Sequence, residues 1–344
     1  MKWVEIDLKA IAGNAAWVKS QLPKGAGFVA AVKADAYGHG MVEVSKVALK
    51  AGAERLGVRD LCEAQALRQA GIKAPIQMLV PFLPEESKLA AKLKVIPVID
   101  SLEQAKALNK AGKFDVQIDL DYGLARWGVN PKELPALVAQ VEKLKNLTLD
   151  GLSAHLAYMP GKNAVEAEEK LGHFTRLAAP YQRKYPTLRL RAANSTVFMD
   201  FPHRRFNQPC IGNLLYGINR SKIRPSAIKM PWKFYARVLS VKEATKGSSI
   251  GYASEYLVPK RMLVANLPVG YADGLTMAPA ERLIGLGASQ SFWGKKDGVN
   301  LPFVGRVGIT HTLVDATGLP GLKPGDAVEL PIRRTACRAP RFYV

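Results

Sequence analysis

The sequence has few cysteines and no long apolar run, and we expect no secretory leader. Its three cysteines, Cys62, Cys210 and Cys337, are odd in number and far apart, which argues against a disulfide framework and a zinc knuckle. No apolar run approaches the ~18 residues of a membrane-spanning helix, and the N-terminal segment is unlike a signal peptide. We therefore expect a cytoplasmic protein without a bound metal or a membrane partner.

Acidic residues are also scarce. There are 29 Asp and Glu against 49 Lys and Arg, which gives a formal net charge of +20. Such an excess is typical of nucleic-acid binders, but here the basic residues are scattered and are not interleaved with aromatic residues. The pattern favours a basic surface that aids solubility or meets anionic small molecules, and we expect no nucleic-acid partner.

Short β-branched runs alternate with longer amphipathic segments over the first two-thirds of the 344 residues. This alternation is typical of parallel βαβ units, and eight strands in ~200 residues predict an α/β fold of the (β/α)8 TIM-like barrel type. A doubly wound open sheet is the structural alternative. The expected strands are Gly27–Lys33, Arg55–Arg59, Pro75–Val80, Val95–Ile99, Asp115–Leu120, Leu147–His155, Leu188–Ala193 and Cys210–Gly217.

The last third of the chain has a different pattern of predicted secondary structure. Phe234–Val241, Met262–Val269 and Ala327–Leu330 predict strands that are separated by Gly- and Pro-rich turns, with no convincing helix between them. Pro225 and Pro231 would break any helix near the boundary between the two parts of the chain. We therefore predict two domains, a barrel over residues 1–229 and a mainly-β domain over residues 230–344.

A lysine closes the first expected barrel strand. Active sites in this fold lie at the carboxyl ends of the strands, which is where Lys33 stands. A poorly solvated amine is easily deprotonated for carbonyl chemistry, whereas a structural lysine extends its amine to solvent. Taken alone, the spacing favours the structural interpretation.

Polar residues follow three later strands. His155 ends the sixth, although a lone histidine is more often structural, and Asn194-Ser195-Thr196 follow the seventh. Cys210 and Gly212-Asn213 belong to the eighth. Barrels commonly hold phosphate in the loops after strands seven and eight. A lysine at one strand end and a phosphate cradle at two others predict pyridoxal phosphate as the cofactor.

Several short segments carry a specific resemblance. They are 31–40 (AVKADAYGHG), 121–128 (DYGLARWG), the segment around His155, 193–195 (ANS), 215–217 (LYG), 251–252 (GY), 268–274 (PVGYADG) and 305–307 (GRV). In this order they resemble the motifs of the alanine racemase family, and the similarity spans the whole chain. The resemblance implies a pyridoxal-phosphate barrel followed by a β domain, in a homodimer whose β domains complete the partner's sites.

The resemblance also assigns roles to residues. Lys33 would bind the cofactor covalently and act as one base, and Tyr252 would be the second base, with His155 as its cationic or hydrogen-bonding partner. Arg126 would orient the substrate or the cofactor's phenolic oxygen, and Tyr271 would line the substrate entrance; a tyrosine of the β-domain core is the alternative for Tyr271. The expected phosphate contacts are Tyr37, Asn194, Ser195, Gly212 and Asn213.

Some positions depart from the family pattern. Asp119 replaces a lysine that is often carbamylated, and as an anion it is expected to pair with Arg126 directly. Cys210 replaces the arginine that faces the pyridine nitrogen. One hypothesis is that Arg191 reaches into the space left by Cys210; in the alternative, the nitrogen meets only a thiol or a water.

Further departures concern the substrate. Ile309 and Thr310 replace a Met-Asp pair, and Cys337 replaces a tyrosine or serine near the entrance. The leading interpretation is an alanine racemase that supplies D-alanine for cell-wall synthesis. A racemase of other amino acids, a decarboxylase or aldolase that uses the same cofactor, and a non-catalytic carrier or basic nucleic-acid-binding protein are the alternatives.

Overall fold

The chain folds into two units. The structure is a computed structural model that describes residues 1–275 and 293–344. One unit consists of Leu8–Met230, and the other combines Met1–Asp7 with Pro231–Val344. The second unit therefore contains both ends of the chain.

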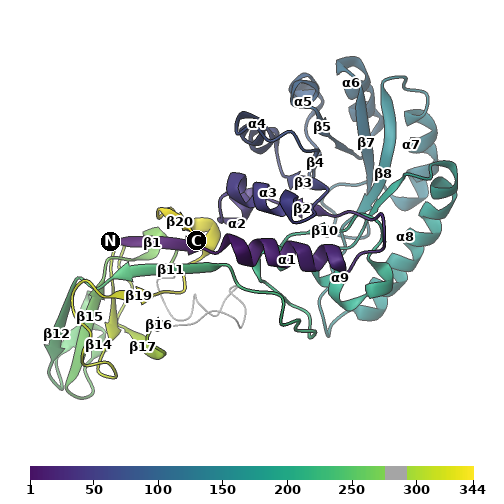
Figure 1. Cartoon of the computed structure of the whole chain (residues 1–344). Coiled ribbons are helices and arrows are strands. Elements are labelled where there is room, and N and C mark those ends of the chain that lie inside the picture. Colours follow the sequence, from purple (N-terminus) through teal and green to yellow (C-terminus); the bar gives the residue numbers. More distant parts are fainter. Residues whose placement is uncertain (276–292) are drawn as a thin grey trace. The chain divides into compact units, whose positions relative to one another are not determined.

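The first unit is a closed barrel of parallel strands (Figure 1). Neighbouring strands pair in chain order, and β10 returns to pair in parallel with β2. The barrel strands are β2 (Val29–Ala31), β3 (Arg55–Val58), β4 (Ile76–Met78), β5 (Val95–Ile96), β6 (Val98–Ile99), β7 (Phe114–Leu120), β8 (Leu147–Ala154), β9 (Arg189–Arg191) and β10 (Cys210–Ile211).

Most of the predicted strands are shorter in the structure, and one is interrupted. β5 and β6 form one path that is broken at Pro97, whose carbonyl still accepts a hydrogen bond from the Gln117 amide (2.9 Å). β9 and β10 are joined where the Cys210 amide donates to the Ala193 carbonyl (2.9 Å). With these links the eight predicted strands form the barrel, and the open-sheet alternative is wrong.

Helices cover the outside of the barrel in Figure 1. Several begin at a side chain that caps the free amides of the first turn, as Asp60 does for Glu63 at 2.8 Å. No helix in the described part of the chain has both the length and the apolar character needed to cross a membrane. The helices are α1 (Leu8–Ser20), α3 (Met41–Lys50), α4 (Leu61–Gln69), α5 (Ser87–Leu93), α6 (Leu102–Ala111), α7 (Leu134–Val141), α8 (Ala164–Lys184) and α9 (Ser195–Asp200).

The second unit is built on a nine-stranded sheet. Its strands, in sheet order, are β12 (Ser240–Ala244), β15 (Met262–Leu267), β18 (Thr312–Asp315), β17 (Val299–Val304), β16 (Trp293–Lys296), β19 (Ala327–Glu329), β11 (Trp232–Arg237), β1 (Lys2–Ile6) and β20 (Arg341–Tyr343). A short hairpin of β13 (Ser249–Ile250) and β14 (Tyr256–Leu257) stands beside it.

Two expectations about this unit need correction. The first residues were assigned to the barrel range 1–229, but β1 pairs with β11 and with β20, so Met1–Asp7 belong to the β unit. The single expected strand Phe234–Val241 is in fact two, because β11 ends at Arg237 and β12 begins at Ser240. Both differences depend on pairing between distant segments, which local patterning does not report.

Candidate active site

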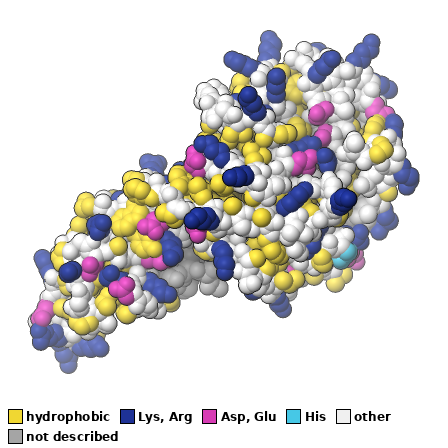
Figure 2. All heavy atoms as spheres, in the orientation of Figure 1, with side chains coloured by type: hydrophobic (Ala, Val, Ile, Leu, Met, Phe, Trp, Pro, Cys, Tyr) yellow, Lys and Arg dark blue, Asp and Glu magenta, His cyan; other side chains and the backbone are white. Residues whose placement is uncertain are grey.

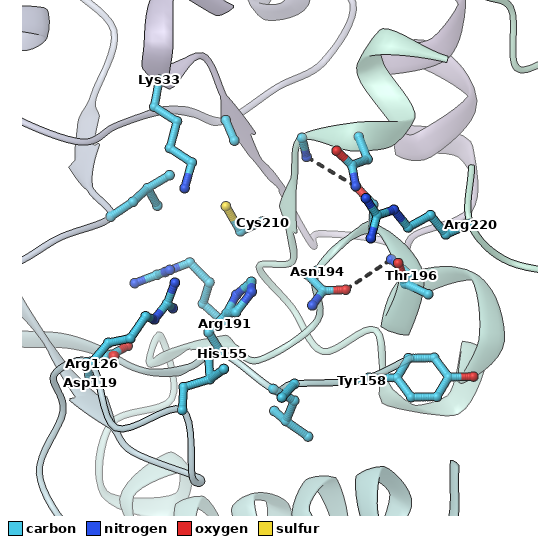
Figure 3. A pocket seen from close by; sticks show the side chains of 18 of the residues that line it. Lys33, Asp119, Arg126, His155, Tyr158, Arg191, Asn194, Thr196, Cys210 and Arg220 are labelled. Atoms are coloured by element: carbon cyan, nitrogen blue, oxygen red, sulfur yellow. Dashed lines mark hydrogen bonds between the residues drawn. The ribbon is translucent and has the colours of Figure 1, made fainter. Parts of the chain in front are cut away.

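A cavity of about 340 Å³ lies among the residues that follow the barrel strands (Figure 3). All the site residues that the sequence placed on the barrel line this cavity. They are Lys33, Tyr37, Asp119, Arg126, His155, Arg191, Asn194, Ser195, Cys210, Gly212 and Asn213. Figure 3 shows Lys33 on one side, with Arg126, His155 and Arg191 on the opposite side and Cys210 between.

Lys33 begins a left-handed turn labelled α2 (Lys33–Tyr37). The residues Ala34–Tyr37 have φ between 52° and 55°, a conformation that costs about 1–2 kcal/mol for each residue with a Cβ. Side chains hold the turn in place: Glu63 accepts from the Ala34 amide (2.7 Å), and Asp35 accepts from the Met41 amide (2.7 Å). Backbone strain that is maintained in this way is common at functional sites.

Tyr37 is a fixed hydrogen-bond donor at the end of this turn. Its ring stacks on Tyr216 with 4.8 Å between centroids, and the Tyr216 hydroxyl donates to the Ala31 carbonyl (2.8 Å). Burial raises the pKa of Tyr37 to about 12. A Cβ on Gly212 would stand 2.7 Å from the Tyr37 oxygen, so glycine is required for this close approach.

Asn194 and Ser195 form a polar cradle at the start of α9. The Asn194 side-chain oxygen accepts from the amides of Thr196 and Val197 (3.0 and 3.1 Å). The Ser195 hydroxyl oxygen accepts from the amides of Gly212 and Leu214 (3.2 Å each). Because its oxygen already accepts two bonds, the Ser195 hydroxyl is oriented to donate its proton, and a phosphate oxygen is a suitable acceptor.

Arg191 and Cys210 lie together in the cavity. Burial raises the pKa of the Cys210 thiol, and the nearby cations Arg191 and Lys33 only partly oppose this effect. The thiol is therefore neutral and a weak donor. Arg191 is only 7% exposed, and its Nη2 atom has no hydrogen-bond partner. An unpaired buried guanidinium nitrogen is costly, so this atom is suited to an acceptor on a bound molecule.

Asp119 does not pair with Arg126 as the sequence predicted. No ion pair joins them in the described structure, and Asp119 instead accepts a hydrogen bond from Ser153. Burial raises the pKa of the Asp119 carboxyl; Arg191 lowers it most, Ser153 next, and Arg126 less. The main cation that stabilises this carboxylate is therefore Arg191, because Arg126 instead places its guanidinium over the Trp127 ring (4.3 Å).

Removal of Asp119 tests its influence on these arginines. We expect Asp119→Ala to raise the KM for the substrate about tenfold, a loss within the range for a charge-assisted hydrogen bond, because Arg191 and Arg126 lose their nearby anion. Asp115→Ala is the matched control, since Asp115 lies on the same strand but is exposed. Equal steady-state constants in Asp119→Ala and the control would show that the carboxylate has no role in binding.

His155 is held neutral by its surroundings. Partial desolvation lowers the pKa of its imidazole, although the residue keeps contact with solvent, and the cations Arg126, Lys33 and Arg191 contribute to this shift. At neutral pH the ring is therefore uncharged. Of the two partnerships that the resemblance implies, these surroundings favour the neutral, hydrogen-bonding one.

The predicted residues of the β domain also gather in one place. The Tyr271 amide donates to the Gly308 carbonyl (3.0 Å), and the Ala272 amide donates to the Ile309 carbonyl (3.1 Å). The Tyr252 ring lies 5.5 Å from the His311 ring. Tyr252 and Ile309 are each 55% exposed and Tyr271 is 39% exposed; Thr310 is also exposed. Tyr271 is thus not a core tyrosine. Cys337 is buried in the same unit.

Two contributors were missed from the sequence. Arg220 lines the cavity beside the Asn194–Ser195 cradle. The only sequence feature that could have indicated Arg220 is its position three residues after the 215–217 (LYG) motif. Asp121 accepts from the amides of Gly123, Leu124 and Ala125 (2.8, 2.9 and 3.2–3.3 Å) and so shapes the loop that carries Arg126. The Asp-x-Gly spacing is typical of such turns.

The donor set of the cavity fits a small anionic aromatic aldehyde. Lys33 provides an amine for a carbonyl group, the cradle and Tyr37 provide hydrogen-bond donors for a phosphate, and the orphaned Arg191 nitrogen needs an acceptor. Pyridoxal phosphate has these three features. A barrel with this constellation at the carboxyl ends of its strands defines a pyridoxal-phosphate-dependent enzyme.

Comparisons with known proteins narrow this class. The N-terminal domain of alanine racemase matches residues 6–220, and the C-terminal domain of alanine racemase matches residues 232–338. The alanine racemase of Halothermothrix orenii is 32% identical over an alignment of 336 residues that covers 95% of this chain and 86% of the relative. The alanine racemase of Geobacillus stearothermophilus is 33% identical over an alignment of 326 residues that covers 92% of this chain and 81% of the relative.

A solved structure agrees with this result. Alanine racemase from Bacillus anthracis with bound L-Ala-P has a TM-score of 0.85 and 29% identity, and the match covers 100% of this chain and 95% of that one. The chain described here belongs to the alanine racemase family. It is an isomerase that racemises alanine and uses pyridoxal phosphate.

Proposed function

We propose that Lys33 and Tyr252 are the two bases of this racemisation. The observation that supports this assignment is the gathering of every predicted barrel residue around Lys33 in one cavity, while Tyr252, Tyr271, Ile309 and Thr310 gather on the β unit. In this proposal the protein is a homodimer, and Lys33 works with Tyr252 of the partner subunit.

The roles follow from proton chemistry. When bound, pyridoxal phosphate supplies an electron sink for the charge that develops at the α-carbon. The Lys33 amine and the Tyr252 phenol then hold and move protons on opposite sides of that carbon, which inverts its configuration. His155, neutral at physiological pH, offers a hydrogen bond and no charge to a phenol that approaches it.

The remaining cavity residues bind and orient. Tyr37, Ser195, Asn194, Gly212 and Asn213 would hold the phosphate, and Arg126 would hold the substrate carboxylate or the phenolic oxygen. Arg191 would contact the ring nitrogen, since Cys210 carries no charge and Arg191 has a buried nitrogen free to donate.

Substrate choice depends on the β-unit cluster. Ile309 and Thr310 present an apolar and a neutral side chain where the family has Met-Asp, which favours a racemase that also accepts amino acids larger than alanine. We propose that the enzyme works in the cytoplasm, where its cellular role is to supply D-alanine for cell-wall synthesis.

Exchange of the α-proton tests this function directly. Each L-amino acid is incubated with holoenzyme in deuterated water and followed by proton resonance and chiral chromatography. We expect exchange together with formation of D-alanine. Exchange without inversion, or release of carbon dioxide or an aldehyde, would favour the decarboxylase or aldolase alternative; absence of both exchange and product would favour a carrier.

A further inference from the structure

A series of buried hydrogen bonds runs through the barrel and ends at Arg191. Arg55, the first residue of β3, donates from both terminal nitrogens to Asp150 (2.7 Å each). The Gln117 side-chain nitrogen donates to Asp150 (3.0 Å) and to Gln208 (2.9 Å). The Gln117 side-chain oxygen accepts from Arg191 Nε (2.9 Å). Gln117 and Gln208 are fully buried.

These partners determine which way the Gln117 amide faces. Its two N–H groups are both used, one by the Asp150 carboxylate and one by the Gln208 oxygen. Arg55 holds that carboxylate in a two-point contact, which is the strongest geometry available to an arginine and a carboxylate. Rotation of the amide would place its nitrogen against Arg191 and lose these bonds, so the oxygen must face Arg191.

The orientation of Gln117 in turn sets the orientation of Arg191. A guanidinium is planar, with its five N–H donors in a fixed arrangement. Once Nε is bound to Gln117, the plane of the guanidinium and the positions of its two terminal nitrogens are restricted. One of them, Nη2, is buried without a partner, and the side chain lines the cavity. Lys33 lies on the opposite side of that cavity (Figure 3).

Glycine makes room for this arrangement. Gly151 pairs with Gln117 in the β7–β8 ladder, and a Cβ there would lie 3.0 Å from the Gln117 nitrogen and 2.5 Å from the Arg189 carbonyl oxygen. The small Cys210 side chain likewise leaves space beside Arg191 in the cavity. The polar series therefore depends on the glycine at position 151 of β8, and the Arg191 side chain has the small Cys210 of β10 in the same cavity.

We propose that Gln117 is a positioning residue that aims Arg191 at the ring of the bound cofactor. Arg55 and Asp150 would thereby determine, through Gln117, which Arg191 nitrogens are available to the pyridine nitrogen when the cofactor is bound. This inference rests on the proposed role of Arg191. It differs from a purely structural role, in which Gln117 would contribute to folding and leave the cofactor unaffected.

The test uses holoenzyme that is loaded with pyridoxal phosphate labelled with ¹⁵N in the ring. The nitrogen's chemical shift reports its hydrogen bonding and protonation. We compare the wild type with Arg191→Met, Gln117→Met and Gln117→Asn; the last keeps the amide but withdraws its oxygen by one methylene. Gln117→Glu is the conservative variant, because its carboxyl keeps an oxygen that accepts from Arg191 Nε, while its single O–H can replace only one of the two N–H donations to Asp150 and Gln208.

Arg189→Met is the matched control. Arg189 lies on the same strand as Arg191, and its guanidinium pairs with Glu54 (2.8 Å). We expect Arg191→Met, Gln117→Met and Gln117→Asn to move the ¹⁵N signal in the same direction, while Gln117→Glu and the control keep the wild-type signal. We also expect kcat to fall up to about a hundredfold in the Gln117→Met and Gln117→Asn variants, with a much smaller change in KM.

The Gln117 and Arg191 variants test the positioning role of Gln117 and the ring contact of Arg191 separately. A wild-type signal in folded Gln117→Asn, with a shifted signal in Arg191→Met, would overturn the positioning role and leave Arg191 as the ring contact. A wild-type signal in Arg191→Met would show that Arg191 does not contact the cofactor ring, and the positioning role of Gln117 would then also be wrong. Should Gln117→Met not fold, Gln117→Asn and Gln117→Glu provide the same comparison.

Discussion

Lys33→Ala is expected to abolish covalent binding of the cofactor and to reduce kcat by on the order of 10⁴-fold or more, as removal of a group that forms a covalent bond does in other enzymes. No other lysine lines the described cavity, so no neighbouring amine replaces it. The absorbance of lysine-bound pyridoxal phosphate should disappear. Borohydride reduction followed by peptide mass spectrometry should label Lys33 in the wild type and give no label in the variant.

The control for this prediction is Lys46→Ala. Lys46 lies on α3 and pairs with Glu43 (2.8 Å) on the protein surface, so its loss should leave the absorbance unchanged. Circular dichroism establishes that both variants fold. An added small amine should restore part of the activity of Lys33→Ala, since it supplies the missing base. Undiminished covalent label in Lys33→Ala would show that another residue binds the cofactor.

Tyr252→Phe is expected to reduce racemisation by about 10²- to 10⁴-fold, the range for loss of a general acid–base group. The two enantiomers of alanine have equal free energy, so kcat/KM must fall equally in both directions. The asymmetry should therefore appear in proton exchange. One enantiomer should still exchange its α-proton through Lys33 and keep its configuration, while the other should lose exchange.

Tyr235→Phe is the matched control for this variant. Tyr235 lies on β11, where it stacks on Trp3 (5.5 Å between centroids), away from the cluster that contains Tyr252. It should racemise alanine at the wild-type rate. If Tyr252→Phe also exchanged both enantiomers at wild-type rates, Tyr252 would not be a base, and a different donor on the β unit would be required.

Much of the barrel was predictable because its signals are local. Each parallel strand is a short apolar run that is bounded by turn residues, so the strand predicted at Arg55–Arg59 is observed with nearly the same bounds at Arg55–Val58. Lys33 and the cradle were found for a similar reason: they follow strands directly, and a parallel barrel brings the ends of its strands together.

Other features depend on which distant segments meet. The barrel, the lysine and the order of the motifs could be predicted from the sequence, because they rest on neighbouring residues. The folded structure was needed to show that β1 belongs to the β unit, that Arg191 rather than Arg126 dominates at Asp119, and that Gln117 orients Arg191. The physical reason is that inward-facing side chains of different strands share one interior, where burial and hydrogen-bond geometry select their partners.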